Sequence, residues 1–134
     1  MSRGIKNHNP GSIRLSSIKW EGEVAGKDKS FCTFESPEYG IRAIGVILIN
    51  YQRKYNLDSI SKMIHRYAPP NENNTEEYID FVCKRVNVLP DEWVDVRTIL
   101  SVMIKAIIKM ENGEQPYGDE VIDRGCQLAL DLFE

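Results

Sequence analysis

One carboxylate, Glu111, stands where general acid chemistry is possible. The segment KAIIKMENGEQPY places it directly after an apolar stretch and before Asn112 and Gly113. The C-terminal end of a helix carries partial negative charge, and apolar surroundings oppose ionisation, so both raise the pKa of a carboxyl group placed there. A carboxylic acid that keeps its proton near neutral pH can protonate a glycosidic oxygen. The alternative is that Glu111 only begins an exposed loop beside a glycine helix cap.

Five helices are predicted to position this residue. Ser36 as N-cap and Pro37 in the first turn predict a long helix, with apolar and aromatic residues from Ile41 to Tyr55 on one face. The expected N-caps of the next three helices are Asp58, Thr75 and Asp95, and the last helix is expected to start near Asp119. Residues 96–110 are apolar around nearly the whole circumference, which predicts the central buried helix.

The first 34 residues are predicted to hold turns and one small sheet. The segment MSRGIKNHNPGSIRL is rich in Asn, Gly, Pro and Ser, which favour irregular structure. The segments SIKWEGEV and SFCTF suit a small antiparallel hairpin or a three-stranded sheet. The fold class is therefore α+β, mainly α. We expect a single domain over residues 1–134, with the loop and hairpin in residues 1–34 and the helical part in residues 36–133.

Composition excludes several function classes. A net charge of −3 and the lack of a basic recognition helix argue against a nucleic-acid-binding protein. Three cysteines without a CxxC pair and only two histidines predict neither a disulfide framework nor a metal site, and no cofactor is expected. The sequence shows no signal peptide and no apolar run of membrane-spanning length. It predicts synthesis in the cytoplasm, no membrane insertion and a monomer.

Several blocks along nearly the whole chain resemble a family of phage structural and cell-wall-degrading proteins. Its pattern RGIRNNNPGNIR, WxG, FxSPexGiRA is similar to RGIKNHNPGSIR, WEG and FESPEYGIRA in this chain. The segments RYAPPNENNTEEYIDFV and AIIKMENGEQPY are similar to the family's later blocks. The chain departs from the pattern at His8 and Ser12, where the family has asparagines.

A looser similarity connects the same blocks with soluble lytic transglycosylases and flagellar peptidoglycan glucosaminidases. In those enzymes the catalytic glutamate ends a helix within Glu-Ser-Gly, which MENG resembles, and the turn and tyrosine blocks resemble NHNPGSI and ENNTEEYIDFV. The acid block comes last in this chain instead of first. The resemblance therefore implies a circularly permuted lysozyme-like fold, which is physically tolerable because domain termini are often close together.

The resemblance implies roles for individual residues. Glu111 would act as general acid and then base, and Tyr67 would line the cleft and orient the reacting sugar. Glu23 or its neighbour Glu21 in the hairpin would be a second carboxylate, unless one acid suffices, as in lytic transglycosylases. The candidate substrate-binding residues are Asn9, Gly11, Trp20, Asn73, Tyr78, Asn112 and Tyr117.

Most of these residues have a structural alternative. Asn9 and Gly11 would only set a turn. Trp20 and Tyr78 would belong to the core, as buried aromatic residues usually do. Tyr67 would close a helix, and Glu23 would be a solvated charge on an exposed sheet face.

Two function classes remain. The favoured one is an enzyme of phage or prophage origin, a muramidase or lytic transglycosylase, that cleaves the glycan strands of peptidoglycan at the bacterial cell wall. The other is a structural protein of a phage particle that has lost the chemistry and binds glycan or another virion subunit. The sequence leaves open whether the product is a reducing sugar or an anhydro sugar.

Overall fold

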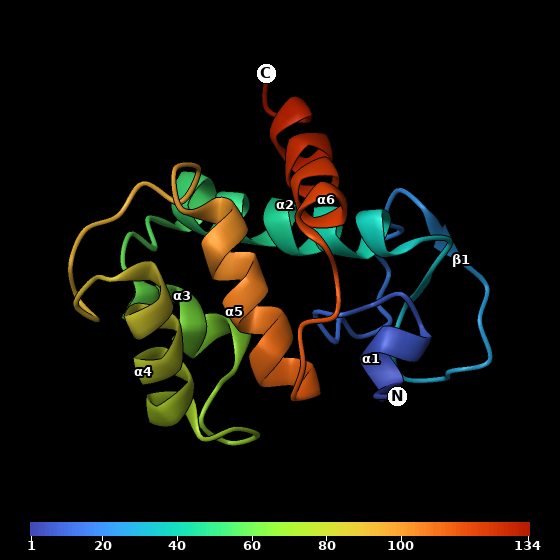
Figure 1. Cartoon of the computed structure of the whole chain (residues 1–134), viewed down its shortest axis with the longest axis horizontal. Helices are drawn as coiled ribbons and strands as arrows, with labels where there is room; N and C mark the ends of the chain where they lie inside the picture. The colour runs from blue at the N-terminus through green and yellow to red at the C-terminus, as the bar shows by residue number, and fades with distance from the viewer.

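Six helices and one two-stranded sheet make up the computed structural model, which describes all residues 1–134 (Figure 1). The predicted class, α+β and mainly α, is confirmed. In chain order the elements are α1 (Arg3–Lys6), β1 (Glu23–Val24), β2 (Thr33–Phe34), α2 (Pro37–Tyr55), α3 (Ile60–Tyr67), α4 (Thr75–Val86), α5 (Leu100–Asn112) and α6 (Asp119–Asp131).

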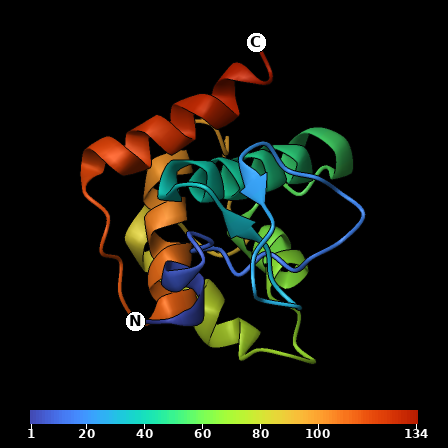
Figure 2. The same ribbon diagram turned by 90° about the vertical axis from the view of Figure 1, so that its right-hand side faces the viewer.

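Helix α5 lies in the middle of the molecule, as its apolar sequence predicts. It packs against α4 on one side and contacts α2, α6 and α1, while α6 packs along α2 (Figures 1 and 2). Its fully buried residues include Met103, Ile104 and Ile107. Val102, predicted to be in the core, is 42% exposed, so one stripe of α5 faces solvent. Leu132, expected to pack from the last helix, is also exposed because α6 ends at Asp131.

Helix α2 begins as its sequence predicts. Ser36 is the N-cap residue and Pro37 is the first helical residue, although the Ser36 hydroxyl makes no capping hydrogen bond. Asn56 ends the helix in the left-handed conformation, with φ of 55°. Ile41, Ile44 and Leu48 are buried on the inner face, whereas Tyr55 at the end of the predicted stripe is exposed.

Three predicted N-caps are displaced. The cap of α3 is Ser59, whose hydroxyl accepts from the Lys62 amide, and the cap of α4 is Asn74. Thr75 is instead the first residue of α4, and its hydroxyl donates to the Ala68 carbonyl at 2.6 Å. Asp95 caps no helix, because its carboxylate accepts from the Arg97 amide in a separate turn and α5 starts only at Leu100.

The N-terminal region differs from the prediction in two ways. Its first residues form a short helix, and its sheet is smaller than expected. Residues Arg3–Lys6 form the short helix α1, which Ser2 caps through its hydroxyl. Strands β1 and β2 pair antiparallel over two residues each, with Glu23 opposite Phe34. The sheet packs beside the start of α2. None of the helices combines the length and apolar character needed to cross a bilayer.

Candidate functional site

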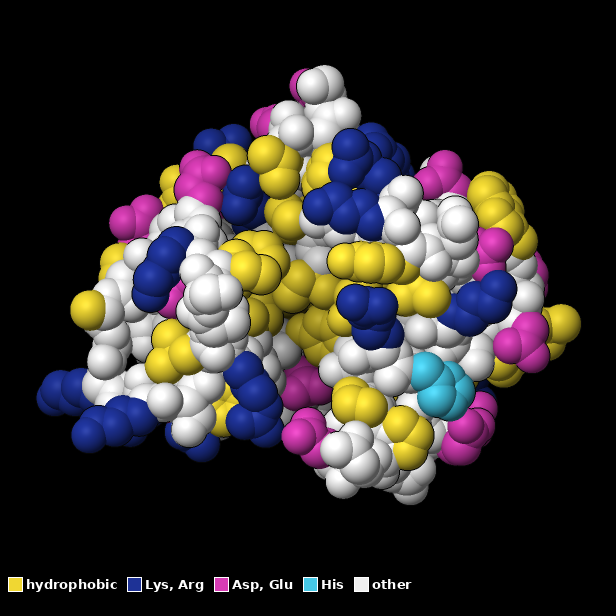
Figure 3. All heavy atoms as spheres, turned by 180° about the vertical axis from the view of Figure 1, so that it is seen from behind, with side chains coloured by type: hydrophobic (Ala, Val, Ile, Leu, Met, Phe, Trp, Pro, Cys, Tyr) yellow, Lys and Arg dark blue, Asp and Glu magenta, His cyan; other side chains and the backbone are white.

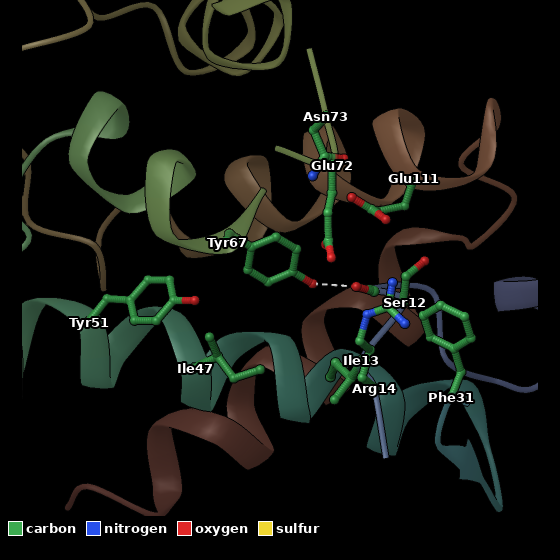
Figure 4. A pocket seen from close by; sticks show the side chains of 11 residues that line it. Ser12, Ile13, Arg14, Phe31, Ile47, Tyr51, Tyr67, Glu72, Asn73 and Glu111 are labelled. Atoms are coloured by element: carbon green, nitrogen blue, oxygen red, sulfur yellow. Dashed lines mark hydrogen bonds between the residues drawn. The ribbon is translucent and has the colours of Figure 1, made fainter. Parts of the chain in front are cut away.

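A groove of about 410 Å³ brings together four segments that are far apart in the sequence. The N-terminal turn contributes Gly11 and Ser12, the end of α3 contributes Tyr67, the α3–α4 loop contributes Asn73, and α5 contributes Glu111. The face seen in Figure 3 has a hollow with a hydrophobic floor, acidic side chains inside it and basic side chains around it. Figure 4 shows the lining residues from close by. Three of the blocks that carry the family resemblance thus meet in one place, whereas no residue of WEG or FESPEYGIRA lines the groove.

Glu111 lies within the last turn of α5, whereas the sequence predicted it directly after a helix ending at residue 110. The helix continues through Asn112, and Gly113 ends it in the left-handed conformation with φ of 75°, which glycine adopts without strain. Because the backbone turns away after Gly113, the Glu111 side chain is left at the groove wall, half-buried.

The surroundings of Glu111 favour its neutral form. Burial raises the pKa of its carboxyl group, and hydrogen bonds from Tyr78 and Ser12 oppose this rise only in part. The Tyr78 hydroxyl donates to Glu111 Oε2 at 2.8 Å. Glu111 therefore keeps a proton to higher pH than an exposed glutamate, as a general acid must.

Replacing Tyr78 by phenylalanine is expected to raise the pKa of Glu111 further. The Tyr78 hydroxyl stabilises the ionised carboxylate, so its removal favours the protonated form, while the ring keeps its packing. A carbon-13 NMR titration of the Glu111 carboxyl group would measure the shift. Tyr117→Phe is the matched control, because the Tyr117 hydroxyl is buried without a hydrogen-bond partner. An unchanged or lower pKa in Tyr78→Phe would contradict this assignment.

Tyr67 lines the groove, but its hydroxyl is already engaged. It donates to the Gly11 carbonyl oxygen at 2.6 Å (Figure 4). A Cβ atom on Gly11 would lie 2.5 Å from the Tyr67 hydroxyl and 2.5 Å from Ile44 Cγ1, so only glycine fits this close approach. Tyr67 thus holds the N-terminal turn against α3 and forms part of the wall.

Tyr67→Phe is expected to lower the free energy of unfolding by about 1–2 kcal/mol, because the Gly11 carbonyl loses its donor in a buried site. Thermal denaturation would measure the change. Tyr55→Phe, at a tyrosine that is 51% exposed, should have no such effect. Equal melting temperatures for the two variants would show that the hydroxyl contributes nothing to stability.

Asn9 and Asn112 do not face the groove, in contrast to the predicted role in substrate binding. Asn9 is fully buried, and its amide donates to the carbonyls of Ile13 and Cys32 and accepts from the Ile13 amide. Asn112 donates to the Pro10 carbonyl at 2.8 Å and accepts from the Ser2 hydroxyl. Both residues use their polar atoms to fix the N-terminal turn, as the structural alternative for Asn9 predicted.

Four other predicted residues are also absent from the groove lining. Tyr78 is buried in the core and reaches Glu111 only through its hydroxyl. Trp20 packs against the hydrophobic core, with its indole nitrogen buried and unpartnered. Tyr117 packs against the same core from the α5–α6 connection. Glu23 accepts a hydrogen bond from the Trp20 amide and lines a separate cavity beside the hairpin, so it does not face Glu111.

The carboxylate that does face the groove is Glu72, which the sequence analysis missed. Its side chain and that of Glu111 enter the same space from the α3–α4 loop and from α5 (Figure 4). Glu72 stands in RYAPPNENN between Tyr67 and Asn73. Its nearness in sequence to these two candidate site residues was the one signal that could have identified it. The other missed lining residues are Ser12, Ile13, Arg14, Phe31, Ile47 and Tyr51.

The groove therefore holds a carboxyl group of raised pKa, Glu111, and a second carboxylate, Glu72, in one open space. No cluster of three metal-ligating side chains is present. The arrangement fits proton transfer to a leaving oxygen, with the second carboxylate available to orient water or to stabilise positive charge.

The chain is similar to a known phage protein. No protein-family model matches the chain. Protein P5 of Pseudoalteromonas phage PM2 is 41% identical over 133 residues, which span 96% of this chain and 82% of that protein. Identity at this level over nearly the whole chain means a shared fold and ancestry. The chain therefore belongs to the family of the phage PM2 protein P5.

Proposed function

We propose that this chain is a phage protein that cleaves the glycan strand of peptidoglycan, with Glu111 as the general acid. One observation carries the proposal: the three segments that resemble transglycosylase blocks, together with Tyr67, converge on a half-buried glutamate of raised pKa in an open groove. Proton donation to the glycosidic oxygen needs a carboxyl group of this kind.

Glu111 would protonate the leaving oxygen and then act as base. If the sugar's own hydroxyl attacks, one carboxyl group is enough and the product is an anhydro sugar. If water attacks, Glu72 is the carboxylate placed to assist it. Tyr78 would hold Glu111 in the orientation seen here.

The experiment is the release of soluble fragments from purified peptidoglycan. Wild-type protein should release them, Glu111→Gln should not, and Glu114→Gln should behave as wild type because Glu114 is exposed three residues further along. Cell walls that a known muramidase digests, but that the folded wild-type protein leaves intact, would exclude the enzyme.

A non-catalytic role in the phage particle is the second candidate. The relationship with protein P5 favours it more directly than the first, because it places the chain in a phage-protein family and brings no reaction with it. A chain of this kind would bind glycan or another virion subunit through the same groove. Co-sedimentation with peptidoglycan without release of fragments would identify this role.

A further inference from the structure

The two ends of the groove share one construction, an aromatic ring with an arginine over it. Phe31 and Tyr51 lie at opposite ends, with Glu111 between them (Figure 4). The guanidinium of Arg14 lies 4.9 Å from the centre of the Phe31 ring. That of Arg66 lies 5.5 Å from the centre of the Tyr51 ring and 4.2 Å from that of Tyr55.

Both of these arginines are free to pair with a ligand. Arg14 and Arg66 are exposed, and neither forms an ion pair within the chain. Arg3 also lies over Phe31, but it is paired with Asp28 at 2.7 Å. Stacking on a ring restricts a guanidinium to few orientations, so less entropy is lost when it binds a carboxylate.

The middle of the groove has the opposite charge. Glu72 and Glu111 both line it, so a ligand that carries an anion on every unit would place negative charge against them. Single-stranded nucleic acid is such a ligand. A glycan that carries carboxylates on some units and none on others can put neutral sugar over Glu111 and anions at the two ends.

We propose that Arg14 and Arg66 form two end subsites that bind carboxylates of an acidic glycan on either side of the segment seated over Glu111. This rests on the proposed function and specifies its substrate class. Each guanidinium offers paired N–H donors to one carboxylate. The groove then selects a carboxylated strand over a neutral polymer of the same sugar backbone, such as a chitin oligosaccharide.

Binding, measured apart from turnover, tests the proposal. The full chain carrying Glu111→Gln is titrated with peptidoglycan glycan fragments, with the same fragments after amidation of their carboxylates, and with chitin oligosaccharides. Arg14→Gln and Arg66→Gln should each weaken binding of the carboxylated fragments by roughly fivefold to tenfold, and neither should change binding of the amidated ones. Arg14→Lys should restore part of the loss because it keeps the charge.

Arg85→Gln is the matched control. Arg85 is also exposed and also lies over an aromatic ring, 4.5 Å from the centre of Phe81, but on α4 away from the groove. Arg85→Gln should leave the binding of the carboxylated fragments unchanged. Equal affinity for carboxylated and amidated fragments would overturn the end subsites and leave the proposed function standing. A folded protein that binds no glycan would overturn both, and stronger binding of an oligodeoxynucleotide than of any glycan would replace the assigned ligand.

Discussion

Glu111→Gln should reduce the rate of glycan cleavage by roughly 10²–10⁴-fold, the range typical for loss of a general acid. Glutamine keeps the shape of the side chain and can still accept the hydrogen bond from Tyr78, so the groove should remain intact. It cannot supply the proton. Fragment release by the wild-type protein should also fall as the pH rises through the raised pKa of Glu111, because the acid form is then lost.

The same substitution should stabilise the protein at neutral pH. The folded-state pKa of Glu111 lies above its unfolded value, so the folded state binds the proton more tightly. Stability from this group is present at low pH and is lost as the pH rises from the unfolded pKa through the folded pKa. Glutamine does not ionise, so it loses no stability as the pH rises. Glu111→Gln should therefore melt at a higher temperature than wild type at pH 7, and the difference in melting temperature should shrink below the unfolded pKa.

Thermal denaturation across this pH range would show the effect. Glu114→Gln serves as the reference, since Glu114 is exposed. A melting temperature for Glu111→Gln below that of wild type at pH 7 would mean that the ionised carboxylate stabilises the fold, which is incompatible with a burial-raised pKa.

Asn9→Ala should cost roughly 2–4 kcal/mol of the free energy of unfolding, the second large effect expected. The substitution leaves the Cys32 carbonyl oxygen and the Ile13 amide without partners, while the Ile13 carbonyl keeps only its bond from the Cys32 amide. Asn9→Asp should be at least as harmful. Its carboxylate would face the same two carbonyls without an N–H to donate.

Urea denaturation would measure both losses, with Asn71→Ala at an exposed position as the control. Asn71→Ala should stay within about 0.5 kcal/mol of wild type. If Asn9→Ala unfolds at the same urea concentration as this control, the N-terminal turn does not depend on its amide.

The sequence predicted a helix end correctly where the conformation of a single residue determines it. Pro37 can occupy only the first turn of a helix, and Gly113 readily takes the left-handed conformation, so the start of α2 and the end of α5 follow from chemistry at those residues. The N-caps of α3 and α4 were each predicted one residue away from their actual positions. In both cases two adjacent polar residues can cap the helix, and tertiary contacts determine which of them does. Thr75 shows this, since its hydroxyl bonds to Ala68 instead of capping.

The groove was less predictable than the helices. Glu111 was identified because a carboxylate after an apolar helix is unusual. Glu72 stands in an exposed polar loop, and its place opposite Glu111 depends on the path of the chain after Pro69 and Pro70. Glu23 was assigned to the groove because lysozyme-like folds carry a hairpin across the cleft, whereas here that strand borders a separate cavity. Long-range packing of this kind has no local sequence pattern.

The bond between Asn112 and the Pro10 carbonyl joins residues 102 positions apart. Closing so long a loop has an entropic cost that only the surrounding packing can offset. During synthesis residues 1–14 are made long before Asn112, so the two walls of the groove cannot meet until α5 has been translated. A chain that stops before α5 therefore lacks the assembled groove.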